Sequence, residues 1–175
     1  MTLSRLSSAL LLACSLFGAG SLTACDGKPA PKLAQVKVDD LPAGQEWMGV
    51  YHNQIYGDLH LVEQETSVVG RWKRKDGSAW GELSGTKRGN VVHFAWKEKK
   101  YGLGGMPGGS TQGKGYFRYK IGANDIPELE GEFGLENDEI GYGRWDCIKQ
   151  KNIKPDLKSI GGDMPDQSGI PAGLQ

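Results

Sequence analysis

The feature that most constrains this chain is a two-residue alternation of apolar and polar side chains, which recurs in eight short segments. Successive side chains of a β-strand point to opposite faces, so this alternation predicts strands with one buried face. One segment, for example, places Val68, Gly70 and Trp72 on the same face. The eight predicted strands are 46–53, 56–63, 66–74, 79–87, 90–98, 113–121, 128–134 and 140–149.

The connections between these segments are mostly short and often contain Gly, Asn or Asp, which favours antiparallel pairing between neighbours. A flat sheet of eight such strands would leave its apolar face and two edges exposed, whereas closure removes both problems. The sequence therefore predicts an all-β fold, either an eight-stranded antiparallel up-and-down barrel or a strongly curved meander. Charged outward faces distinguish this barrel from outer-membrane barrels, whose outward faces are apolar.

The residues assigned to the interior are mostly aromatic or aliphatic. They are Trp47, Gly49, Tyr51, Leu59, Leu61, Val68, Gly70, Trp72, Leu83, Val92, Phe94, Trp96, Phe117, Tyr119, Ile121, Leu129, Gly131, Phe133, Gly143, Trp145 and Cys147. The opposite faces carry charges such as Glu128, Glu130 and Glu132 on one strand, and Arg144 and Asp146 on another. Many of the 27 glycines lie beside aromatic residues, which indicates curved strands wrapped around large rings.

The first 25 residues, MTLSRLSSALLLACSLFGAGSLTAC, have the pattern of a secretory signal. Arg5 is followed by an uncharged stretch rich in Leu, Ala, Ser and Gly, for which we expect a signal helix. The final LTAC resembles the lipobox of bacterial lipoproteins. This resemblance implies cleavage before Cys25, a diacylglycerol on its thiol and an acyl chain, such as palmitate, on its new amino group. LLAC, ending at Cys14, is a rival, but it leaves a much shorter apolar stretch; an ordinary signal that contains a cysteine is another alternative.

Several acyl chains together give lasting membrane attachment, so the lipobox predicts a lipid-anchored protein of the bacterial cell envelope. Asp26 follows the lipidated position and resembles the enteric signal for retention in the inner membrane, so it favours the inner membrane. Other bacteria use other sorting rules, so the outer membrane stays open as the alternative. The predicted organisation is a signal peptide at 1–24, a lipidated flexible tether at 25–44, a barrel at 45–150 and a disordered tail at 151–175. The two flanks are rich in Pro, Lys and Asp, which is typical of unstructured segments.

The charge balance and the motifs of the chain argue against nucleic acids and nucleotides as partners. The chain has 21 basic and 21 acidic residues, so it has no electrostatic basis for binding nucleic acid. In the glycine-rich stretch 101–117, Gly108, Gly113 and Lys114 approach the spacing of a phosphate-binding loop. However, Gly115 stands where a phosphate-binding loop requires Ser or Thr, and a strand follows where such a loop requires a helix. The sequence therefore does not predict a nucleotide site. We expect a long loop at the barrel mouth, able to act as a lid or contact surface.

Catalytic and metal-binding chemistry finds little support in the sequence. The alternation places His52, His60 and His93 on outward faces, where solvated surface histidines are the favoured interpretation. His52, Asp58 and His60 remain an alternative metal site. Cys147, assigned to the interior, is the only cysteine after Cys25, so it has no partner for a disulfide within the barrel. No histidine is predicted to face it and activate its thiol. We predict no catalytic residue, no metal, no cofactor and no enzymatic activity.

Aromatic residues are the main binding candidates. Tyr51, Trp72, Trp96 and Trp145 point inward and either fill the core or line a small pocket. Trp80 falls on the outward face and is predicted to be an exposed anchor for a partner.

Two short pieces of sequence add a resemblance. GVYHNQIYG (49–57) and GNVVHFAWKEK (89–99) look like strands of avidin-type and lipocalin-like small barrels. Avidins are eight-stranded meanders that hold biotin with Asn, Tyr, Trp and Asp side chains. The resemblance implies a similar architecture here, with Asn53, Trp96 and Asp146 in positions that could contact a ligand.

Together these features predict a membrane-anchored cell-envelope lipoprotein with a non-enzymatic structural or protein-interaction role, such as an accessory subunit of a machine for secretion, adhesion or motility. Its partners would be the membrane and other envelope proteins. The alternative is a periplasmic barrel that binds a small apolar or aromatic-stacking ligand. An inward cavity of roughly 300 Å³ or more would favour the ligand, and a filled interior would favour protein partners.

Overall fold

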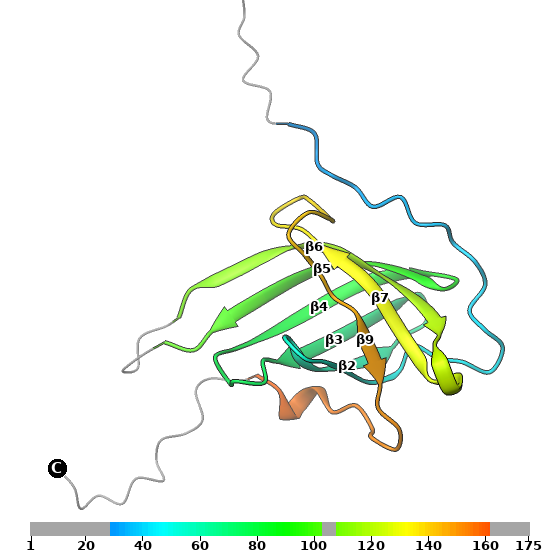
Figure 1. Ribbon diagram of the computed structural model, residues 1–175. Helices are drawn as coiled ribbons and strands as arrows, with labels where there is room; N and C mark the ends of the chain where they lie inside the picture. Colours follow the sequence, from blue (N-terminus) through cyan, green and yellow to red (C-terminus); the bar gives the residue numbers. More distant parts are fainter. Residues whose placement is uncertain (1–28, 103–107, 162–175) are drawn as a thin grey trace, which may run out of the picture.

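The computed structural model describes residues 29–102 and 108–161, which form an all-β fold with nine strands (Figure 1). The predicted signal segment, Cys25 and Asp26 lie outside these ranges. The strands are β1 (Gly49–Asn53), β2 (Gly57–Glu63), β3 (Ser67–Lys73), β4 (Ala79–Arg88), β5 (Val91–Lys100), β6 (Ser110–Ile121), β7 (Pro127–Phe133), β8 (Gly143–Arg144) and β9 (Cys147–Lys149). Two short 3₁₀ turns, η1 (Ala123–Asp125) and η2 (Leu157–Ser159), complete the elements.

The strands close into an antiparallel barrel, as the alternation predicts. Each strand from β1 to β7 pairs with the next along the chain, and β9 lies between β7 and β1. β8 and β9 together form the eighth strand of the barrel, because both pair with β7 in the same register. The interruption between them arises at Asp146, whose Oδ1 accepts a hydrogen bond from the Gly131 backbone amide at 3.1 Å.

The barrel has two ends with different connections. The β1–β2, β3–β4, β5–β6 and β7–β8 connections gather at one end, here called the mouth end. The β2–β3, β4–β5 and β6–β7 connections gather at the opposite end. No helix within the described ranges has the length and hydropathy needed to cross a bilayer.

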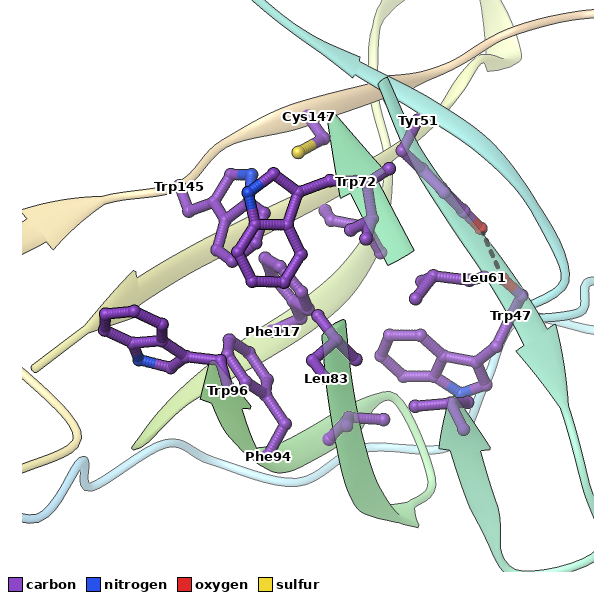
Figure 2. Packing of buried hydrophobic residues seen from close by; sticks show 14 of the residues in the cluster. Trp47, Tyr51, Leu61, Trp72, Leu83, Phe94, Trp96, Phe117, Trp145 and Cys147 are labelled. Carbon is purple, nitrogen blue, oxygen red and sulfur yellow. Dashed lines mark hydrogen bonds between the residues drawn. The ribbon is translucent and has the colours of Figure 1, made fainter. Parts of the chain in front are cut away.

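Most of the predicted interior residues form one buried cluster (Figure 2). Trp145 lies among five other rings, those of Tyr56, Trp72, Phe94, Phe117 and Phe133, with centroid separations of 4.8 to 6.1 Å. Packing of this kind, in which four of the five ring pairs meet edge to face, adds to the stabilisation that comes from apolar burial alone. The barrel interior is therefore a packed core.

Ile121 is an exception to the predicted inward set, since 37% of it is exposed. It is the last residue of β6, at the opposite end of the barrel, and so lies beyond the core. The start of β6 also differs from the prediction, because the strand begins at Ser110 and incorporates part of the glycine-rich stretch. Gly113 allows this, since a Cβ there would lie 2.0 Å from the carbonyl oxygen of Gly134.

The chain segments that flank the barrel are packed against it. The described parts of the segments predicted as a flexible tether and a disordered tail, 29–44 and 151–161, include residues that hydrogen-bond to the barrel. Residues 32–39, here called the N-terminal strap, run along the outside of the barrel (blue in Figure 1). Residues 156–161, the C-terminal segment, cover part of the outer face of β2, β3 and β4.

Candidate functional site

A small cavity opens at the mouth end of the barrel, above the aromatic core. Its volume is about 70 Å³. The lining residues come from β3, β5, β6 and β7 and from positions between strands; they are Tyr56, Trp72, Arg74, Trp96, Glu98, Lys100, Thr111, Phe133, Tyr142 and Trp145. The walls are thus mainly aromatic, and the charged groups lie together on one side.

Three of the five predicted binding residues line this cavity, namely Trp72, Trp96 and Trp145. Tyr51 does not line it, because it is fully buried deeper in the core. Its hydroxyl donates a hydrogen bond of 3.0 Å to the carbonyl oxygen of Trp47 (dashed in Figure 2). Burial is also the main reason why the pKa of Tyr51 is strongly raised.

Trp80 is not exposed as predicted, since only 7% of it is accessible. It does point outward from β4, but the C-terminal segment covers it: a Cβ on Gly161 would lie 2.5 Å from its ring. The cations of Arg71 and Lys99 also approach the ring, at 5.6 and 4.7 Å from its centroid. Trp80 therefore anchors a segment of its own chain.

An ion pair that the sequence interpretation missed forms the charged side of the cavity. The Nε and Nη2 groups of Arg74 donate to the two carboxylate oxygens of Glu98, both at 2.9 Å. The Glu98 side chain is 8% exposed and that of Arg74 is 32% exposed. Hydrogen bonding to Glu98 raises the pKa of Arg74, and the guanidinium also lies 5.6 Å from the centroid of the Tyr56 ring. A buried carboxylate needs such a partner, because an isolated charge in the core is very costly.

The indole nitrogens around the cavity differ in their bonding. Trp96 Nε1 donates to the carbonyl oxygens of Lys114 and Gly134, both at 3.2 Å. Within the part of the chain that the structure describes, the buried Nε1 atoms of Trp72 and Trp145 have no acceptor. A buried donor without an acceptor costs about 1–3 kcal/mol. At Trp72 and Trp145 the packing of the rings therefore outweighs the loss of the indole hydrogen bond.

The three histidines have separate partners on the outer surface. His52 Nδ1 is 2.7 Å from Asp58 Oδ1, whereas His60 Nδ1 accepts from the Asp156 amide at 2.9 Å. His93 Nδ1 lies 3.2 Å from a carboxylate oxygen of Glu139. The alternative site of His52, Asp58 and His60 is thus not assembled, and no group of three or more potential metal ligands occurs among the described residues.

Cys147 is buried, as its inward position predicts, and desolvation strongly raises the pKa of its thiol. Because the thiolate is the nucleophilic form, this environment is poorly suited to covalent catalysis. The geometry offers no base to activate it, since the described histidines have acidic or backbone partners on the outer surface.

The residues implied by the avidin resemblance do not meet around one ligand position. Asn53 Nδ2 donates to the backbone oxygen of Asp146 at 2.7 Å, and its Oδ1 accepts from two amides of the β1–β2 turn. The Asp146 carboxylate faces outward, where it contacts Arg144 and the Gly131 amide. Only Trp96 of the three lines the cavity.

A much larger hollow lies on the outside of the barrel. An open groove of about 800 Å³ crosses the outer faces of β3, β4, β5 and β6. Small side chains, including Ser84 and Ala95, form part of its floor, and Leu157 and Lys158 of the C-terminal segment form one wall. Glu136 and Asn137, from the β7–β8 connection, also line it.

No protein-family model, curated protein or solved structure matches this chain.

Proposed function

We propose that this protein is a cell-envelope lipoprotein, anchored to a membrane through Cys25, whose barrel binds another envelope protein and has no catalytic role. The observation that carries the binding part of this proposal is the contrast between the two hollows. The interior holds a cavity of only about 70 Å³, whereas the outer groove measures about 800 Å³. Sites for small molecules usually measure about 300–1,000 Å³ and are well enclosed, so a small-ligand function has less support.

The charges along the groove favour an acidic partner segment. Lys97, Lys114 and Lys158 line the groove, and none of them forms an ion pair within the described ranges. Glu136 and Glu82 are opposing charges on the same surface, and Glu82 lies 3.7 Å from Arg71, another cation of the lining. The small floor residues leave space for the backbone of an extended segment, and the lysines would attract acidic side chains.

The anchor is tested by growing cells with an alkyne analogue of palmitate and detecting labelled protein after click chemistry. We expect Cys25→Ser to abolish labelling and Cys14→Ser to leave it unchanged. Loss of labelling in Cys14→Ser with retention in Cys25→Ser would contradict the assignment of the lipobox.

The groove is tested by site-specific photo-crosslinking in cells, with benzoylphenylalanine at Ala95. The matched control is the same probe at Ile148, an exposed residue on β9, away from the groove. We expect a discrete crosslinked envelope protein from Ala95 only, and at least a fivefold lower yield when Lys97 and Lys114 are both changed to Glu. Equal yields from the two probe positions, or insensitivity to the charge reversal, would contradict the proposal.

A further inference from the structure

The N-terminal strap is fixed at the mouth end of the barrel. The backbone amide of Lys32 donates to Asp138 Oδ1 at 2.9 Å, and the Glu139 amide donates to the Lys32 oxygen at 2.8 Å. The Ala34 amide then donates to the Glu139 carboxylate at 3.0 Å. Asp138 and Glu139 belong to the β7–β8 connection, so the beginning of the strap lies beside the mouth.

The end of the strap is fixed at the opposite end of the barrel. The Asp39 amide donates to Asn90 Oδ1 at 2.8 Å, and the Asn90 amide donates to the Asp39 oxygen at 2.9 Å. Asn90 is in turn held by the backbone of Tyr119. Gly89 makes room for this contact, because it has a φ of +51° and a Cβ there would lie 2.1 Å from the Asp39 oxygen. The strap therefore has a defined direction along the barrel, from mouth to opposite end.

This direction determines which end of the barrel lies nearer to the anchor. Lys32 lies seven positions after Cys25, so even a fully extended chain spans at most about 25 Å between them. The opposite end is further away by roughly the length of the strap, about 23 Å at 3.3 Å per residue. We propose that the barrel stands with its mouth end toward the membrane and that the rim of the mouth contacts the lipid headgroups. This inference rests on the proposed lipid anchor at Cys25.

The chemistry of the rim suits a lipid surface. Ile55 and Tyr142 are 66% and 60% exposed, and both belong to connections at the mouth. Lys75 and Lys100 are exposed beside them, and cationic side chains near an anionic bilayer each contribute about 1 kcal/mol of attraction. The nearby acidic group of Asp76 is engaged by the Ser78 amide and hydroxyl, at 2.9 and 2.7 Å. Tyrosine is a residue that favours the boundary between apolar and aqueous regions.

Composition alone would not choose between the two ends. A groove at the opposite end, of about 870 Å³, also combines exposed apolar residues, Met48 and Ile153, with the lysines Lys151 and Lys154. The strap favours the mouth, because its first fixed residue, Lys32, lies beside the β7–β8 connection and the proposed anchor precedes it by only seven positions. The opposite end thus provides the comparison surface for the experiment.

The test uses the chain from Cys25 onward, coupled through the Cys25 thiol to a maleimide lipid in phosphatidylethanolamine–phosphatidylglycerol vesicles. Hydrogen–deuterium exchange is compared between tethered and free protein. We expect at least twofold slower exchange of the amides in 54–56, 74–78 and 134–142, and no change in 64–66 and 122–126. Protection of the opposite end, or no protection at either end, would overturn the proposal. Because the coupling is chemical, the result does not depend on whether cells lipidate Cys25.

A linker variant tests whether the short reach is responsible. Insertion of 20 Gly and Ser residues between Gly27 and Lys28 adds up to about 70 Å of reach without altering the barrel. We expect the protection at the mouth to fall at least by half in this variant. Unchanged protection would show that the strap and its short connection do not orient the barrel, and would overturn the inference. Tryptophan fluorescence confirms that the variant is folded.

Discussion

Removing either partner of the Arg74–Glu98 pair should destabilise the barrel, but to different extents. Arg74→Met leaves the Glu98 carboxylate, whose side chain is only 8% exposed, without its cation. Loss of one partner of a buried pair typically costs about 3–5 kcal/mol, and we expect about 3–4 kcal/mol here. Glu98→Gln leaves a guanidinium that is 32% exposed and can still be hydrated. We expect Glu98→Gln to lower the free energy of unfolding by about 1–2 kcal/mol, because it weakens one bidentate contact.

The free energy of unfolding can be measured by urea titration followed by tryptophan fluorescence, since the buried tryptophans report on the core. We expect Arg74→Met to lower the urea midpoint more than Glu98→Gln does. The double variant Arg74→Met/Glu98→Met removes both charges and should lie within about 1 kcal/mol of the parent protein.

The reasoning would be refuted if Glu98→Gln were the more harmful single change, or if the double variant lost the sum of the two single effects. Greater harm from Glu98→Gln would mean that the unpaired carboxylate is not the main cost, and additive single effects would mean that the two side chains are not energetically coupled.

Three further predictions concern packing and ionisation. Gly81→Ala should lower stability by about 1–3 kcal/mol in thermal melts, because its Cβ would lie 2.1 Å from Trp72, whereas Gly109→Ala meets no heavy atom within 4 Å and should be neutral. Burial raises the pKa of Tyr119 to about 12, so between pH 10 and 12 the folded state retains a proton that the unfolded state loses. The free energy of unfolding should therefore fall as pH rises through this window, and fall less steeply in Tyr119→Phe, as urea midpoints at pH 9, 10 and 11 would show. Trp80→Ala should release the C-terminal segment, detected as faster tryptic cleavage there while the barrel remains folded.

The barrel could be predicted from the sequence because the two-residue period translates directly into faces. Once Val68, Gly70 and Trp72 are assigned inward, short connections and the need to cover eight apolar faces leave closure as the stable arrangement. The same period also contains the signal for the missed ion pair. Arg74 continues the inward positions of β3, and Glu98 continues those of β5 after Trp96. Charged residues in an inward register at the ends of two strands indicate a buried pair at the barrel mouth.

The covering of the outer surface could not be predicted in this way. Alternation assigns Trp80 to the outer face correctly, but it contains no information about which distant segment packs there. The contacts that bury Trp80 come from residues about eighty positions later, including Gly161. The N-terminal strap is similar, since its hydrogen bonds use backbone amides and isolated side chains such as Asp138 and Asn90. Such contacts leave no periodic pattern in the sequence.

The β7–β8 connection links the features on which the two proposals depend. Glu136 and Asn137 line the outer groove, Asp138 and Glu139 hold the strap, and Tyr142 belongs to the rim of the mouth. A partner bound in the groove would consequently lie beside the anchored end of the barrel, close to the membrane surface. This arrangement would favour a partner that presents its acidic segment near the bilayer, because the proposed anchor at Cys25 would limit how far the groove can move from the membrane. A partner whose binding segment lies far from the membrane would require release of the strap, and so would bind more tightly to the variant with the 20-residue linker.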